Sequence, residues 1–136
     1  MRIPDGSSNR GSWGKTDRLT LVKRWIGRWI LGVGVVHTLF GLVVFRGTWQ
    51  TLWAEGLFNT VNGQPEREFP VWFLSAGILT MLFGSLVDWV EGQGWPVPRS
   101  VAWGLLGMTV LILVIMPVSG GWLLLPAVMG LFNPRT

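Results

Sequence analysis

Residues 25–45 read WIGRWILGVGVVHTLFGLVVF, and this run decides the fold class. Apart from Arg28, His37 and Thr38, every residue in it is apolar or glycine. As an α-helix the run extends about 31 Å, close to the hydrocarbon thickness of a bilayer. It is too long for the apolar region of a cleavable signal peptide, which has about 7–15 residues. The run therefore predicts a membrane-spanning helix.

The composition of the whole chain agrees with a membrane protein. Of its 136 residues, 49% are apolar and only 13% are charged, and the mean hydropathy is +0.45. Soluble domains carry about 25% charged residues, which they need to cover a surface that faces water. The composition excludes a disordered chain and disfavours a soluble domain. The length fits one domain, which we place at residues 24–134.

Three further apolar segments follow the first one. With it they predict four spans, an all-α integral membrane four-helix bundle. We place the spans at about residues 25–45, 71–90, 100–117 and 120–133. The fourth segment is short and contains Pro126, so we expect a short, kinked span, with a segment that stops partway as the alternative.

The connection at residues 46–70 carries its own helical pattern. Trp49, Leu52, Trp53 and Leu57 recur at helical spacing, which predicts a short amphipathic helix in the membrane interface. The turn-rich residues 59–65 should end it. Most of the ten tryptophans fall near predicted span ends, as in an aromatic belt.

The basic residues predict the orientation. Seven of the eleven Lys and Arg residues precede residue 29, so residues 1–23 should be a mobile, basic, cytoplasmic tail. Four crossings then place both termini in the cytoplasm, with Arg135 inside, and the expected location is a bacterial inner membrane. Because the net charge of +4 comes from this asymmetry, we do not interpret it as nucleic-acid binding.

Small residues recur on single faces of three predicted spans. In lipid, helices associate through close packing at such residues. The positions are Gly27, Gly34 and Gly41 in the first span, Gly77, Gly84 and Ser85 in the second, and Gly104 and Gly107 in the third.

His37 is the first candidate site residue. It shares the face of Gly34 and Gly41, so its side chain should point into the bundle. An ionisable group within a membrane span is a functional hypothesis by default, here a proton acceptor, a ligand donor or an axial ligand. The alternative is a neutral imidazole hydrogen-bonded to Thr38, Thr80 or a backbone carbonyl.

Asp88 is the second candidate. It lies near the cytoplasmic end of the second span, where it either pairs with Arg28 or is solvated separately by headgroups. The candidate ligand or proton site therefore comprises His37, Asp88, Arg28 and Thr38. We predict no catalytic residues.

Several chemistries are disfavoured. With no cysteine and one histidine, the chain has no disulfide, thiolate or multi-histidine metal site, and haem with two histidine ligands would need a dimer. No nucleotide-binding glycine loop and no serine triad are present. We predict no cofactor and no metal.

Five runs in the chain resemble a family of small bacterial four-span membrane proteins of unknown function. These runs are residues 24–27 (RWIG), 37–41 (HTLFG), 56–61 (GLFNTV), 71–74 (VWFL) and 117–123 (PVSGGWL). The resemblance covers roughly residues 22–134 and implies a membrane architecture and a bacterial origin, without an activity. The plan is more loosely similar to DoxX-like four-helix membrane proteins.

The leading hypothesis is a membrane protein, not an enzyme, that binds a hydrophobic ligand or a membrane partner through its bundle. One alternative is a homodimeric proton-coupled transporter of small molecules, in which His37 carries the proton. Another is a membrane enzyme that acts on a lipid or quinone. The expected partners are the lipid bilayer and either a second copy or another membrane protein.

Overall fold

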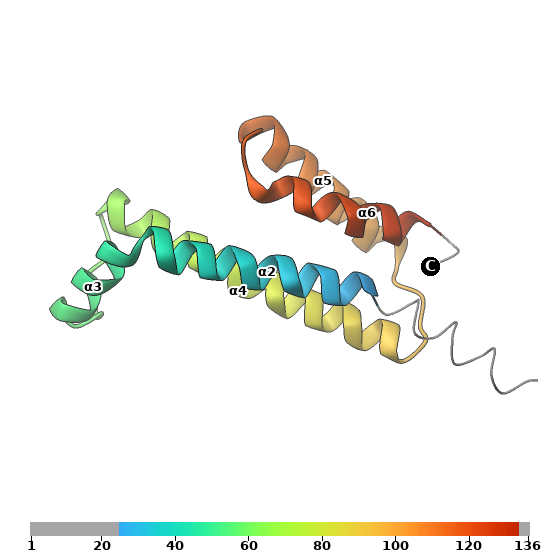
Figure 1. Cartoon of the computed structure of the whole chain (residues 1–136), viewed down its shortest axis with the longest axis horizontal. Coiled ribbons are helices and arrows are strands. Elements are labelled where there is room, and N and C mark those ends of the chain that lie inside the picture. Colours follow the sequence, from blue (N-terminus) through green and yellow to red (C-terminus); the bar gives the residue numbers. More distant parts are fainter. Residues whose placement is uncertain (1–24, 134–136) are drawn as a thin grey trace, which may run out of the picture.

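The computed structural model describes residues 25–133, which form five α-helices and one 3₁₀ helix and contain no strand (Figure 1). The all-α prediction is confirmed. The helices are α2 (Trp25–Val44), α3 (Arg46–Glu55), α4 (Pro65–Gly92), α5 (Arg99–Ile115), the 3₁₀ helix η1 (Gly120–Leu124) and α6 (Leu125–Phe132). The predicted tail at residues 1–23 and Arg135 lie outside the described residues.

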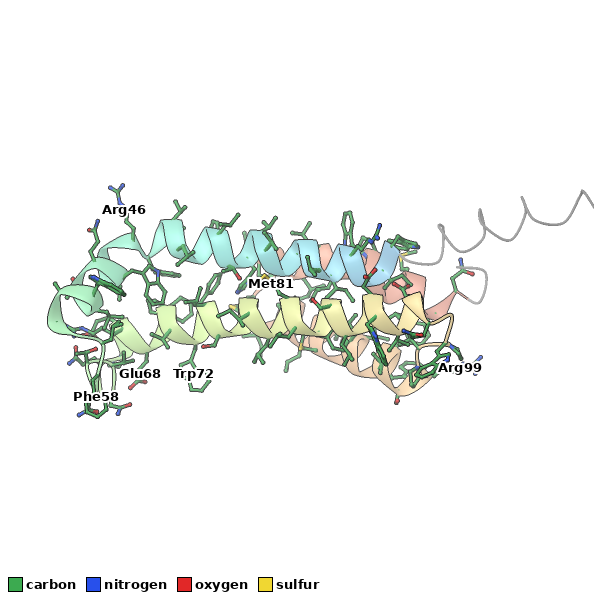
Figure 2. The ribbon with its side chains drawn as sticks, turned by 90° about the horizontal axis from the view of Figure 1, so that it is seen from below. Arg46, Phe58, Glu68, Trp72, Met81 and Arg99 are labelled. Atoms are coloured by element: carbon green, nitrogen blue, oxygen red, sulfur yellow. The ribbon has the colours of Figure 1, made fainter. Side chains whose placement is uncertain are left out.

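Helices α2 and α4 form a long antiparallel hairpin, and both are long and apolar enough to cross a membrane (Figure 1). Glycines allow their backbones to approach closely. A Cβ atom on Gly34 would lie 2.7 Å from the main-chain nitrogen of Met81, whose side chain lies between the two helices (Figure 2). Gly27 faces the main chain of Asp88 in the same way. The predicted glycine face of the first helix therefore packs against α4.

Helix α4 begins at Pro65, before the predicted start at residue 71. Pro70 lies inside the helix and is buried. Proline removes one main-chain hydrogen bond, and this loss is tolerated because other contacts hold the first turns. Arg67 makes two of these contacts, donating to the carbonyl of Thr60 and to the carboxylate of Glu55.

Helix α3 is present in the connection, but it is shorter than the predicted pattern. It ends at Gly56, which adopts a left-handed conformation with φ of 91°, and the N–H of Gly56 donates to the carbonyl of Leu52. Leu57 follows the helix with φ of 50°, so its assignment to the helical face was wrong. Leu52 is buried and Trp53 is exposed, which leaves the helix with one covered side.

A second hairpin consists of α5, η1 and α6. The segment that returns after α5 is short and consists of η1 followed by α6. The Ser119 hydroxyl accepts a hydrogen bond from the N–H of Gly121 at the start of η1, and α6 takes over at Leu125, with Pro126 in its first turn. The five residues of η1 and eight of α6 together extend roughly 20–22 Å.

The second hairpin packs beside the beginning of α2 (Figure 1). The indole N–H of Trp29 donates to the carbonyl of Leu123 at 2.7 Å. A buried core also joins the two hairpins. Its members are Ile26, Ile30, Val87, Leu105, Ala127 and Val128. Gly104 and Gly107 meet no atom within 4 Å where a Cβ would be added, so the predicted role of these two glycines in packing the bundle was wrong for the described part of the chain.

Candidate functional site

His37 lies between α2 and α4 and contacts Phe73. Its Nε2 is 3.1 Å from the carbonyl oxygen of Phe73, so in this arrangement Nε2 carries a proton and donates. The two rings are stacked, with centroids 3.9 Å apart and planes at 12°. Phe73 also contacts the rings of Phe40, Phe45 and Phe69. This geometry matches the second possibility given for His37, an imidazole that is hydrogen-bonded to a backbone carbonyl.

Thr38 is the neighbour of His37 and faces Gly77 across the hairpin. Its Oγ1 atom is buried and has no hydrogen-bond partner among residues 25–133. A buried hydroxyl without a partner is uncommon. Thr38 and His37 therefore place two neighbouring polar side chains in the contact between α2 and α4.

Arg28 and Asp88 form an ion pair, the first of the two arrangements that the sequence left open. Nε of Arg28 lies 3.4 Å from Oδ1 of Asp88, and 69% of the arginine side chain is exposed. Because Arg28 precedes His37 by nine positions, about 13 Å of helix separates the two. The four predicted residues therefore lie in two separate places and do not form one site.

Glu91 was missed as a candidate. Its residue surface is only 6% exposed, and its Oε2 accepts a hydrogen bond of 3.0 Å from the N–H of Gly27. Gly27 is the third residue of α2, where the main-chain N–H has no acceptor within the helix and a negative charge is favourable. The glycine face of α2 could have indicated Glu91 in the sequence. Gly27 on that face lies opposite Asp88, and Glu91 follows Asp88 by nearly one helical turn.

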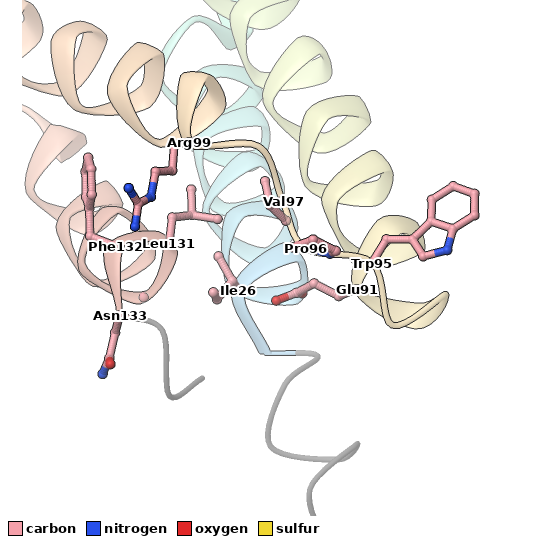
Figure 3. A pocket seen from close by; sticks show the side chains of 10 residues that line it. Ile26, Glu91, Trp95, Pro96, Val97, Arg99, Leu131, Phe132 and Asn133 are labelled. Atoms are coloured by element: carbon pink, nitrogen blue, oxygen red, sulfur yellow. The ribbon is translucent and has the colours of Figure 1, made fainter.

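A cavity of about 310 Å³ lies beside Glu91 (Figure 3). It is bounded by the first turn of α2, the end of α4, the connection to α5 and the end of α6. Its polar side chains are Glu91, Arg99 and Asn133. The lining also includes Ile26, Val97 and Leu131. None of the four predicted site residues lines this cavity.

The chain belongs to the family of unknown function DUF6463. The match covers residues 21–135, which include every described residue. No curated protein and no solved structure matches the chain. Membership in DUF6463 assigns no activity to the chain. The looser similarity to DoxX-like proteins stays a prediction.

At the end of the long hairpin that lies away from the cavity, this DUF6463 protein carries an exposed ion pair between α3 and α4. Nη1 of Arg67 lies 2.6 Å from Oε2 of Glu55, which joins the first turn of α4 to the last turn of α3. The hydrogen bond from Arg67 is the main cause that lowers the pKa of Glu55 below its usual value, and the positive charge of Arg67 adds to it. Residues 25–133 contain no cluster of three or more His, Cys, Asp or Glu side chains placed to hold a metal ion.

Proposed function

We propose that this DUF6463 protein is an integral membrane protein that binds an amphipathic small molecule in the cavity beside Glu91. The observation that carries the proposal is the cavity itself, whose lining combines a buried carboxylate and other polar groups with apolar side chains at the end of two long apolar helices. Its volume falls at the lower limit of small-molecule sites, about 300–1,000 Å³.

The surface of the long hairpin supports the membrane part of the proposal. In the most apolar windows of α2 and α4, only 28% and 22% of the residues are buried. A core helix of a soluble protein would be mostly covered. Large side chains such as Val43, Leu79 and Leu82 are exposed instead. Contiguous apolar faces of this extent are rare on soluble monomers and suit contact with lipid.

The proposed topology has four crossings with both termini in the cytoplasm of a bacterial cell. Helices α2 and α4 are the long crossings, and α5 with η1 and α6 supplies the shorter pair. The basic residues before residue 29 favour this orientation. The cavity then lies near the cytoplasmic surface, since it involves the start of α2 and the end of α4.

The cavity is a better candidate for ligand binding than His37. One face of the imidazole is stacked on Phe73 and its Nε2 is engaged by a carbonyl. A ligand there would have to separate α2 from α4. At the Glu91 end the space already exists, so binding needs no rearrangement of the hairpin.

A proton-coupled transporter is the second candidate, favoured by the partly buried, ionisable His37 within α2. His37→Gln keeps an N–H donor for the carbonyl of Phe73 but does not titrate near neutral pH. Loss of proton flux in vesicles containing this variant, with unchanged folding, would support the transporter. Retention of that flux would contradict a proton role for His37.

The test of the leading proposal is native mass spectrometry of the protein extracted gently from its membrane. Asn133→Trp places a large ring at the cavity, and Val118→Trp is the matched control at a fully exposed turn outside it. We expect the wild type and Val118→Trp to retain a small amphiphile that Asn133→Trp loses. Equal retention by all three, or recovery of the wild type in the soluble fraction after alkaline carbonate washing, would contradict the proposal.

A further inference from the structure

We propose that residues 56–59, which we call the apolar tip, insert into the outer leaflet of the membrane, with Leu57 and Phe58 at the boundary between headgroups and acyl chains. The tip follows α3, at the end of the long hairpin that lies away from the cavity. This inference rests on the membrane part of the proposed function and not on a ligand in the cavity. It depends on the exposure and backbone of the tip, and on the depth at which Arg67 holds it.

The apolar tip displays two large apolar side chains on a strained backbone. Phe58 is 93% exposed and Leu57 is 56% exposed. Leu57 has φ of 50° and Asn59 has φ of 58°, and this left-handed conformation is tolerated by asparagine but rare for leucine. Such strain persists only where the surrounding structure holds it, and it is concentrated at functional positions. The tip is therefore a candidate contact surface.

Arg67 holds the chain on both sides of the tip. Its guanidinium donates two hydrogen bonds, of 2.6 and 3.1 Å, to the carboxylate of Glu55, the last residue of α3. The same side chain donates to the carbonyl of Thr60 at 3.0 Å. A bidentate pair of arginine and carboxylate fixes geometry as well as adding energy. The apolar tip is therefore a closed loop that is fixed to the first turn of α4.

The position of Arg67 along α4 sets the depth of the tip. From Glu68 to Asp88 the helix rises about 30 Å, which matches the hydrocarbon thickness of a bilayer. No charged residue lies between these two positions. Arg67 therefore lies at the edge of the hydrocarbon region. The interfacial layer beyond that edge is about 5–7 Å thick on each side, so the tip that Arg67 holds lies within it.

The side of the hairpin that carries the tip continues into the proposed lipid-facing surface. Figure 2 shows Phe58 and Trp72 on the same side of the long hairpin. Trp72 is exposed, as are Phe69 just before it and Leu79 about two turns further along α4. Helix α4 packs chiefly against α2, and no other helix among the described residues covers this side at the level of Trp72. Aromatic and leucine side chains in such a band fit a lipid surface better than a protein partner.

The test places single cysteines in the full-length protein, which has none of its own, and labels them with nitrobenzoxadiazole in phospholipid nanodiscs. Phe58→Cys is compared with Ala54→Cys, a matched control at an exposed position of α3. Ala54 lies about 200° around α3 from the buried Leu52, so it points away from the hairpin. We expect lipids with a spin label at the top of the acyl chain to quench most of the fluorescence at residue 58. Iodide in the water should quench residue 54 instead.

A second labelled position tests Phe58 itself. With the label at Leu57→Cys, Phe58→Asp should lower the inserted population by about ten-fold or more, the factor that burial of a phenylalanine side chain supplies. Quenching by the spin-labelled lipid should then be lost. Phe58→Leu keeps an apolar side chain and should keep the quenching. Equal quenching in Phe58→Asp and Phe58→Leu would overturn the insertion of the tip.

A label at Leu79→Cys separates this inference from the proposed function, because Leu79 is exposed near the middle of α4. Lipids with a spin label in mid-chain should quench it. Quenching at residue 79 but not at residue 58, with iodide reaching residue 58, would overturn the insertion of the tip alone. Protection of residue 58 from both quenchers would show that protein covers the tip and would overturn the lipid surface as its partner. Absence of quenching by lipid at both residues would overturn the membrane part of the proposed function as well.

Discussion

The main-chain N–H of Gly27 donates to Oε2 of Glu91 at 3.0 Å, across 64 positions of sequence. This single hydrogen bond joins the first turn of α2 to the last turn of α4. It satisfies a main-chain donor that a helix start leaves open, and it places a buried carboxylate at the edge of the cavity. The same contact therefore joins the two long helices and places a carboxylate in the lining of the cavity.

Glu91→Ala should destabilise the protein. The substitution leaves the N–H of Gly27 without its acceptor and opens space in the end of the hairpin, at a cost of about 1–3 kcal/mol. Glu91→Gln keeps an oxygen acceptor and should cost less. Thermal unfolding in detergent measures both, with the exposed Glu66→Ala as the control. A midpoint for Glu91→Ala equal to that of the control would show that the hydrogen bond does not support the fold.

Gly34→Ala and Gly32→Ala should have opposite effects, although both lie in α2. A methyl group on Gly34 would lie 2.7 Å from the main-chain nitrogen of Met81, which cannot move away without shifting α4, whereas Gly32 faces open space. We expect Gly34→Ala to destabilise by about 1–3 kcal/mol through overpacking. Gly32→Ala should stabilise by about 0.5–1 kcal/mol, because alanine loses less backbone entropy. Thermal midpoints in the same detergent compare them, and similar shifts would contradict the predicted packing.

The pair of Glu55 and Arg67 should make stability depend on pH. The pKa of Glu55 is lowered in the folded protein, chiefly by the hydrogen bond from Arg67, so the pair contributes stability above the ordinary value of 4.5. That contribution is lost as the pH falls through the lowered pKa. Glu55→Gln and Arg67→Gln should each remove this part of the pH profile, and the double variant should remove no more. Additive losses would indicate that the two side chains act independently.

A single cysteine at residue 118 should report the topology. The chain has no cysteine of its own, so Val118→Cys creates a unique thiol at a fully exposed position in the turn between α5 and η1. If α5 crosses the membrane, a maleimide that cannot permeate the membrane should label this residue from outside intact cells. A cysteine at exposed Gln93 provides the matched cytoplasmic position and should react only after lysis. Protection of both positions in intact cells would contradict an external turn.

The sequence predicted the helices well because they depend on local pattern. The apolar run at residues 25–45 and the spacing of Gly27 and Gly34 were sufficient to predict α2 and the face that packs on α4. The predicted span covered only the apolar part of α4 from about residue 71. The first turns of α4 were not predicted, because they are polar and the contacts of Arg67 that hold them are formed with residues earlier in the chain.

The candidate site was less predictable. His37 was noticed because an ionisable residue stands out in an apolar run, but its partner Phe73 lies 36 positions away and follows from the register of the hairpin. Glu91 was overlooked because a charge at the end of a span usually faces water. Its contact with Gly27 depends on how α2 is aligned against α4, which is not a pattern within α4.

Photocrosslinking tests the central claim most directly. The full-length protein would be reconstituted with a phospholipid that carries a diazirine near its glycerol group, as a probe for amphiphiles, and the crosslinked residues would be mapped by mass spectrometry. On the cytoplasmic side, the account predicts crosslinks concentrated at residues 95–99 and 131–133, which Asn133→Trp removes and Val118→Trp does not. Crosslinks distributed evenly along the exposed faces of α2 and α4, and unchanged in Asn133→Trp, would contradict an amphiphile site beside Glu91.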